Sequence, residues 1–125
     1  MKYIKTDKAP KAIGPYSQAI VSGNFVFCSG QIGINPQTNT LVEGIKNQIR
    51  QIMSNLGAVL KAAGADFNQV VKTTIYVTNI DNFALVNKIY GEYFKDNKPA
   101  RATVQVSRLP LEALVEIDAI AVIKS

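Results

Sequence analysis

The sequence predicts an α+β domain in which two helices pack on one face of a mixed β-sheet. A chain of 125 residues is long enough for one domain, 1–125, and too short for two. Two stretches carry apolar residues at helical spacing, and six shorter runs are rich in β-branched residues or alternate in polarity. These elements follow one another in the order βββαβαββ, which is typical of helices gathered on one side of a sheet.

Composition excludes several kinds of site. The sequence has no histidine and one cysteine, Cys28, which excludes imidazole chemistry, Cys-based zinc sites and an internal disulfide. We interpret Cys28 as a small buried hydrophobe and not a nucleophile. The net charge is +5, but the lysines are scattered, which argues against nucleic-acid binding as the main role. Without a signal-peptide core or a membrane-spanning run, the protein is expected in the cytoplasm.

The first three strands are predicted at 2–6, 16–22 and 25–29. A stretch rich in proline and glycine separates the first two strands, and a Ser-Gly-Asn turn precedes the third. The third strand is apolar on both faces, which indicates burial on both sides. Residues 30–44 contain several turn-forming residues and are predicted to form one long loop.

The clearest helix is predicted over Ile45–Gly64, with Gly64 as its C-terminal cap. Its apolar residues recur at steps of three and four, which is the spacing of one buried helix face. They are Ile45, Ile49, Ile52, Met53, Leu56, Leu60 and Ala63.

The second half of the chain predicts a strand at 70–78, a helix capped by Asp81 that runs to about Asp96, and strands at 102–107 and 115–123. The packed side of this helix is expected to hold Phe83, Val86, Tyr90, Tyr93 and Phe94. Ile120 and Val122 lie opposite the main apolar face of the last strand, so the sheet face without helices would expose apolar surface. We expect that face to pack against other subunits; a curved sheet that partly closes on itself is the alternative.

Two charged residues stand in unexpected places. Arg101 lies at the entry to a strand, on the same face as Thr103, and Glu116 lies in an otherwise apolar strand with Asp118 facing the same way. Such groups are costly to bury unless they are paired or line a cleft. They could form an ion pair between adjacent strands, lie exposed at the sheet ends, or form a pocket in which arginine binds an anion and glutamate handles a proton.

Three further side chains are weaker candidates. Tyr16 is a core tyrosine or a site residue, Ser29 lacks a base to activate it, and Asn87 could face a ligand or bond to a strand.

Taken in order, five segments resemble the RidA (YjgF) family of reactive-intermediate deaminases, over nearly the whole chain. The segments are Ala12–Ala19, Ser29–Ile32, Val71–Val77, Pro99–Val104, and Leu109-Pro110 with Val115–Ala121. The resemblance implies a chorismate-mutase-like fold and a homotrimer with clefts between its subunits. It also implies hydrolysis of 2-imino acids and their enamines, such as 2-iminopropanoate and 2-iminobutanoate, to 2-oxo acids and ammonia, without cofactor or metal.

Residue by residue, the resemblance implies that Arg101 binds the substrate carboxylate and that Glu116 positions or activates water. It places Tyr16, Ser29 and Asn87 in the same cleft. Thr103 stands where many members carry cysteine, so a thiol role at that position is in doubt. The alternatives are an RNA-directed, translation-inhibiting ribonuclease and a non-catalytic, ligand-binding or chaperone-like trimer.

Overall fold

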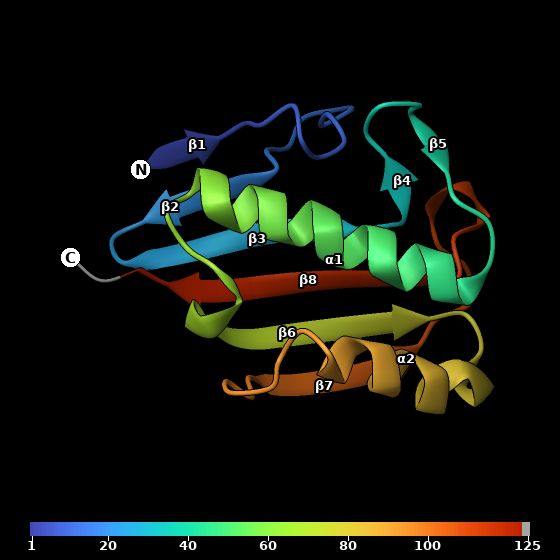
Figure 1. Cartoon of the computed structure of the whole chain (residues 1–125). Coiled ribbons are helices and arrows are strands. Elements are labelled where there is room, and N and C mark those ends of the chain that lie inside the picture. Colours follow the sequence, from blue (N-terminus) through green and yellow to red (C-terminus); the bar gives the residue numbers. More distant parts are fainter. Residues whose placement is uncertain (124–125) are drawn as a thin grey trace.

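The computed structural model describes residues 1–123 and confirms the predicted α+β fold, with two helices on one face of a mixed sheet (Figure 1). The strands are β1 (Lys2–Ile4), β2 (Ala19–Ser22), β3 (Phe25–Gln31), β4 (Ile34–Asn35), β5 (Thr40–Leu41), β6 (Val70–Val77), β7 (Ala100–Gln105) and β8 (Val115–Val122). The helices are α1 (Ile45–Ala62) and α2 (Phe83–Gly91).

Six strands form the main sheet in the order β1-β2-β3-β8-β6-β7. Only β6 and β7 pair in parallel, because α2 connects them; the other neighbours in this sheet are antiparallel. Within the predicted loop 30–44, the start belongs to β3, and β4 and β5 form a small hairpin. That prediction was wrong because strands of two residues leave almost no periodic signal.

The predicted face of α1 is confirmed. Six of its seven residues are buried, and Ile45 is half-buried at the first turn. The helix ends in a Schellman motif: the N–H of Ala65 donates to the carbonyl of Leu60 at 2.8 Å, and that of Gly64 to Lys61 at 3.0 Å. Gly64 has φ 84°, a conformation that favours glycine. The C-terminal cap itself is Ala63, so Gly64 lies one residue after the cap, whereas the sequence predicted it at the cap.

Helix α2 differs from its prediction at both ends. Asn79, not Asp81, caps the preceding 3-10 turn, by accepting a hydrogen bond from the Asp81 N–H at 2.9 Å. The helix ends at Gly91, several residues before Asp96, where glycine lowers helix propensity. The aromatic pair after it still packs as predicted, with the ring of Phe94 4.7 Å from that of Tyr90.

Strand bounds also shift. β1 and β2 are shorter than predicted, and β7 begins at Ala100, so Arg101 lies within the strand and not at its entry. Gln18, the residue before β2, is buried, and its side-chain amide bonds to the carbonyls of Thr6 and Pro10 in the preceding loop.

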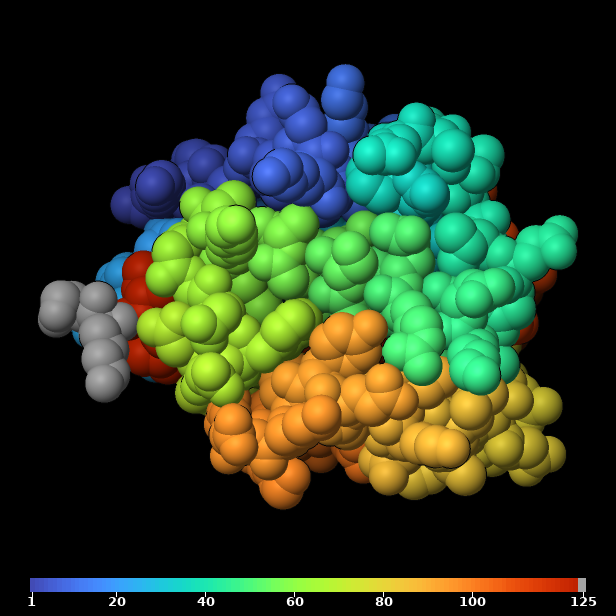
Figure 2. Space-filling view, in the orientation of Figure 1, coloured from blue at the N-terminus to red at the C-terminus, as the bar shows by residue number. Residues whose placement is uncertain are grey.

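The helices cover one face of the sheet, seen in Figure 2, and the other face is uncovered. Phe25, Phe27 and Val104 lie on the uncovered face with 47%, 45% and 41% of their surfaces exposed. The sheet stays open, with β1 and β7 at its edges, so it does not cover this face by closing on itself. Among residues 1–123, neither helix is long and apolar enough to cross a membrane.

Candidate functional site

Arg101 projects from β7 over one stripe of α2. Its Nη1 donates to Oδ1 of Asn87 at 2.7 Å, and its guanidinium carbon lies 5.4 Å from the ring centre of Phe83 and 5.1 Å from that of Tyr90. These three residues stand at positions i, i+4 and i+7, so one helix face supplies every contact. We call this group, Arg101 with Phe83, Asn87 and Tyr90, the arginine cradle.

The cradle fixes the guanidinium but leaves its charge unpaired. Tyr90 is itself anchored, since its hydroxyl bonds to that of Thr73 at 2.7 Å in the buried layer between α2 and the sheet. The ion pairs among residues 1–123 are Arg50–Glu92 and Arg108–Glu112, and neither involves Arg101. A planar guanidinium that is held in place and faces solvent is suited to bind a carboxylate through two parallel hydrogen bonds.

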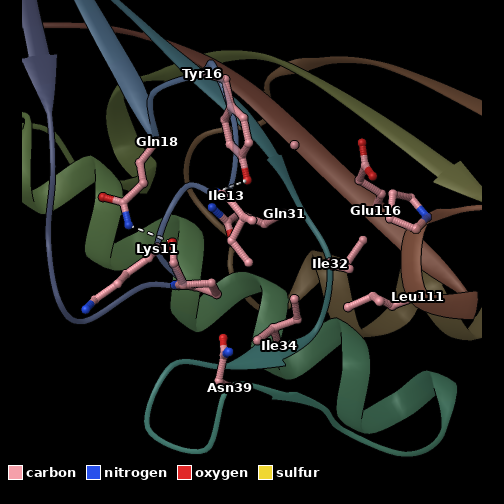
Figure 3. Close-up of a pocket in the computed structure, with 13 residues that line it drawn as sticks. Lys11, Ile13, Tyr16, Gln18, Gln31, Ile32, Ile34, Asn39, Leu111 and Glu116 are labelled. Carbon is pink, nitrogen blue, oxygen red and sulfur yellow. Dashed lines mark hydrogen bonds between the residues drawn. The ribbon is translucent and has the colours of Figure 1, made fainter.

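Glu116 projects from β8 into a second hollow, with a volume of about 380 Å³ (Figure 3). We call it the glutamate pocket. Gly30 lies directly beneath the carboxylate, where a Cβ would overlap the Glu116 oxygen, so only glycine admits this position of the side chain. The pocket is lined by Pro10, Lys11, Ile13, Tyr16, Gln18, Gly30, Gln31, Ile32, Ile34, Asn39, Pro110, Leu111 and Glu116.

Two causes raise the pKa of Glu116 above its ordinary value. Burial is the larger, and the negative charge of Asp118, two residues along the same face of β8, is the smaller. Asp118 is held by Tyr76, whose hydroxyl donates to Oδ2 at 3.1 Å. A carboxyl group with a raised pKa is a stronger base when ionised than an ordinary glutamate, which suits a group that takes a proton from water.

Buried amides hold two walls of the glutamate pocket in place. Gln18, 3% exposed, accepts from the N–H of Thr6 at 2.7 Å and donates to the carbonyl of Pro10 at 2.7 Å, which fixes the N-terminal wall. Asn55, on α1 and fully buried, donates to the carbonyl of Ile34 at 2.9 Å. Side chains on these otherwise irregular segments are therefore held in defined positions.

The other predicted site residues lie in the two regions or in hollows next to them. Asn87 lies in the arginine cradle, and Thr103 borders a shallow hollow beside Arg101, with a buried hydroxyl oxygen that has no hydrogen-bond partner among residues 1–123. Tyr16 lines the glutamate pocket and is 54% exposed, so the interpretation as a core residue was wrong. Ser29 lies in a neighbouring hollow, where its hydroxyl donates to the carbonyl of Ser17 at 2.5 Å.

Within one chain, Arg101 and Glu116 do not meet. Arg101 lies in register with Thr73, which is buried beneath the helices. Glu116 lies in register with Tyr76, three residues further along β6 and therefore on the opposite face of the sheet. Because β6 separates β7 from β8, the interpretation as an ion pair between adjacent strands was wrong.

Several residues of these two regions were not predicted from the sequence. Phe83 and Tyr90 were assigned only to packing, although their spacing with Asn87 and the arginine after Pro99 was a usable signal. Nothing in the sequence indicated that Gly30 would contact Glu116. This contact arises at a β-bulge in β3, where the register with β8 shifts between Cys28 and Gln31. Cys28 is buried as predicted, and burial raises its thiol pKa to about 12.

Comparisons with known proteins agree on one family. A model of the family described as Endoribonuclease L-PSP matches residues 6–123. The chain is 54% identical to a RutC family protein of Pyrococcus horikoshii over 94% of each chain. It is 48% identical to the human protein named 2-iminobutanoate/2-iminopropanoate deaminase, over 97% of this chain and 89% of that one. The structure of Escherichia coli TdcF with bound serine matches with a TM-score of 0.96 at 39% identity, over 99% of this chain and 100% of TdcF.

Proposed function

The chain belongs to the Endoribonuclease L-PSP family, which includes the RidA (YjgF) reactive-intermediate deaminases, and on this premise we propose that it hydrolyses 2-imino acids to 2-oxo acids and ammonia. 2-Iminopropanoate and 2-iminobutanoate are the proposed substrates, and their proposed sources are pyridoxal-phosphate-dependent dehydratases of the cytoplasm. A relative named for these two substrates is 48% identical to this chain. A solved relative has serine bound, and serine carries an α-carboxylate as the proposed 2-imino acids do.

One observation carries the proposal: the chain has two incomplete sites of opposite charge. Among residues 1–123, Arg101 is paired with no carboxylate, and the pocket of Glu116 contains no arginine; the cation that lines it is Lys11, whose ammonium lacks the planar fork of a guanidinium. A head-to-tail contact, in which the uncovered, apolar sheet face of one copy meets the edge formed by β7 and α2 of the next, would join the two regions. We therefore propose a homotrimer with three clefts, each with Arg101 and Asn87 from one subunit and Glu116 and Tyr16 from the next.

In such a cleft, Arg101 binds the substrate carboxylate through two charge-assisted hydrogen bonds and thereby fixes C2 of the imine. Asn87 and the two rings of the arginine cradle hold the guanidinium while it does so. Thr103 borders the hollow beside Arg101, but its hydroxyl oxygen is buried there, so we assign the contact with the substrate carboxylate to Arg101 and not to Thr103.

Glu116 then moves the protons. The substrate is bound as the iminium ion, and the Glu116 carboxylate takes a proton from a water molecule while the water oxygen bonds to C2 and the C=N electron pair moves to nitrogen, which gives a neutral carbinolamine. Glu116 returns this proton to the carbinolamine nitrogen. The C–N bond then breaks and ammonia leaves, while the hydroxyl oxygen forms the carbonyl and gives up its proton to the Glu116 carboxylate, which releases it to solvent. The raised pKa of Glu116 suits both steps, since the group must gain and lose the same proton.

The family description names a ribonuclease, and RNA cleavage is the activity that this proposal sets aside. The exposed guanidinium lies over two aromatic rings, and among the described residues Lys98 is the one further cation that lines the hollow at Arg101; two cations match one small carboxylate better than a polyphosphate chain. Tyr16 is the exposed aromatic residue of the glutamate pocket, so a run of stacked bases has no matching row of rings there.

The test generates 2-iminobutanoate in situ with a threonine dehydratase and traps unhydrolysed imine with semicarbazide. Wild type should compete with the trap, and Arg101→Ala and Glu116→Gln should each lose about 10²-fold or more of this activity. Lys61→Ala is the matched control, because Lys61 is an exposed cation in the last turn of α1 and lines neither the hollow at Arg101 nor the glutamate pocket.

If wild type leaves the trapped imine unchanged, the deaminase proposal is wrong. If Arg101→Ala keeps full activity in a folded assembly, the activity stands and the assignment of the carboxylate-binding residue is wrong.

A further inference from the structure

The turn between β7 and β8 holds an apolar side chain in an unusual position. Leu111 and Glu112 both have left-handed backbones, with φ of 57° and 60°. Residues other than glycine rarely adopt this conformation, because Cβ crowds the following carbonyl oxygen, and two in succession are rarer still. Leu111 is also 67% exposed, so burial of its side chain does not explain the conformation.

The turn is held rigidly on both sides of Leu111. The N–H of Glu112 donates to the carbonyl of Leu109 at 3.2 Å, and that of Ala113 to Pro110 at 3.1 Å. Beyond the turn, the N–H of Leu114 donates to Oε1 of the buried Gln48 at 2.9 Å. The surrounding structure therefore imposes the left-handed pair, and such imposed conformations concentrate at functional sites.

The result is that Leu111 faces the glutamate pocket. In Figure 3, the side chains of Leu111 and Ile32 lie below the Glu116 carboxylate, and both line the pocket. Ile34 adds to this apolar end. At about 380 Å³, the pocket has room for roughly twelve water molecules at ~30 Å³ each, which is far more than a methyl or ethyl group fills.

We propose that Leu111 is the specificity-determining residue of the glutamate pocket, and that with Ile32 it binds the aliphatic side chain of the 2-imino acid. This inference rests on the proposed function. The carboxylate is held at one end of the substrate by Arg101, and the reacting carbon lies at Glu116. The side chain then extends toward the apolar end, where a longer aliphatic group buries more surface against Leu111.

The test measures kcat/KM for a series of imines made in situ by an L-amino-acid oxidase with catalase, from alanine, 2-aminobutyrate, norvaline and leucine. Leu111→Gly removes the side chain and leaves a residue that accepts the left-handed backbone. It should lower kcat/KM about 10-fold for the leucine-derived imine and less than about twofold for the alanine-derived imine. Glu112→Gly is the matched control, because it changes the same backbone conformation at a residue outside the pocket lining, and it should leave the ratio between substrates unchanged.

The outcomes separate the two proposals. If wild type hydrolyses none of the four imines, the proposed function fails and this inference fails with it. If wild type hydrolyses them but Leu111→Gly lowers all four equally, or dissociates the assembly without changing the ratio, only the role of Leu111 is overturned.

Discussion

The arginine cradle and the glutamate pocket hold opposite charges in different ways. The cradle is made by residues close together in the chain: three side chains on one face of α2 contact a guanidinium that stays exposed. The pocket is assembled from β3, β8, the N-terminal loop and the turn before β8, and its carboxyl group is half-buried with a raised pKa. An exposed fixed cation is suited to binding, and a half-buried acid to proton transfer. In the proposed enzyme, therefore, damage to the cradle should raise KM and damage to the pocket should lower kcat.

The largest effect is expected from Gly30→Ala. The added methyl group would overlap the Glu116 carboxylate and push it away from its position on β8. Since a shift of about 1 Å in a catalytic group costs on the order of 10²-fold, kcat should fall by about that factor while KM changes little. Steady-state kinetics on 2-iminobutanoate measure both constants.

Gly91→Ala is the control for this change, because a Cβ at Gly91 would meet no atom within 4 Å. It should leave kcat unchanged. A Gly30→Ala protein with normal kcat would show that the position of Glu116 does not matter to the reaction.

A smaller effect, on KM and not on kcat, is expected from Asn87→Asp. The new carboxylate would lie where the amide oxygen now accepts from Arg101 at 2.7 Å, so it would pair with the guanidinium and compete with the substrate carboxylate. KM should rise about 10-fold with kcat nearly unchanged. Asn87→Ala, which removes the bond without adding a charge, should raise KM less; an equal rise in both variants would contradict competition.

The sequence predicted the features that depend on residues close together in the chain and did not predict those that depend on contacts between distant segments. Helical spacing predicted α1 and the packed side of α2, and strand alternation placed Asp118 beside Glu116. The bulge at Gly30 and the left-handed turn at Leu111 were not predictable, because both depend on packing between segments distant in the chain. The separation of Arg101 and Glu116 was missed for the same reason: strand order decides it, and β6 inserts between two strands that are consecutive in sequence.

The smallest effect is expected from Asp118→Asn. Removing this negative charge lowers the pKa of Glu116, but burial remains as the larger cause, so the acidic limb of the pH–rate profile should move to lower pH while staying above that of an ordinary glutamate. Tyr76→Phe leaves the charge in place and serves as the comparison. A limb that does not move in Asp118→Asn would show that Glu116 does not set it.

The same raised pKa gives a prediction for stability. Because the folded state holds the Glu116 proton more tightly than the unfolded chain does, this group stabilises the fold below its ordinary pKa of about 4.3. That contribution is lost as pH rises through the raised value. The free energy of unfolding of wild type relative to Glu116→Gln should therefore decrease as pH rises, and a constant difference between the two proteins would contradict the raised pKa.

The central claim is that each active site takes Arg101 from one subunit and Glu116 from another, and subunit mixing tests it most directly. Arg101→Ala and Glu116→Gln are unfolded together in equal amounts, refolded, and assayed for 2-iminobutanoate hydrolysis, with each variant refolded alone as the control. Random assembly gives about one quarter of the clefts both an intact Arg101 and an intact Glu116, so about one quarter of the wild-type activity should return. No recovery in mixed assemblies of the native size would contradict the shared site.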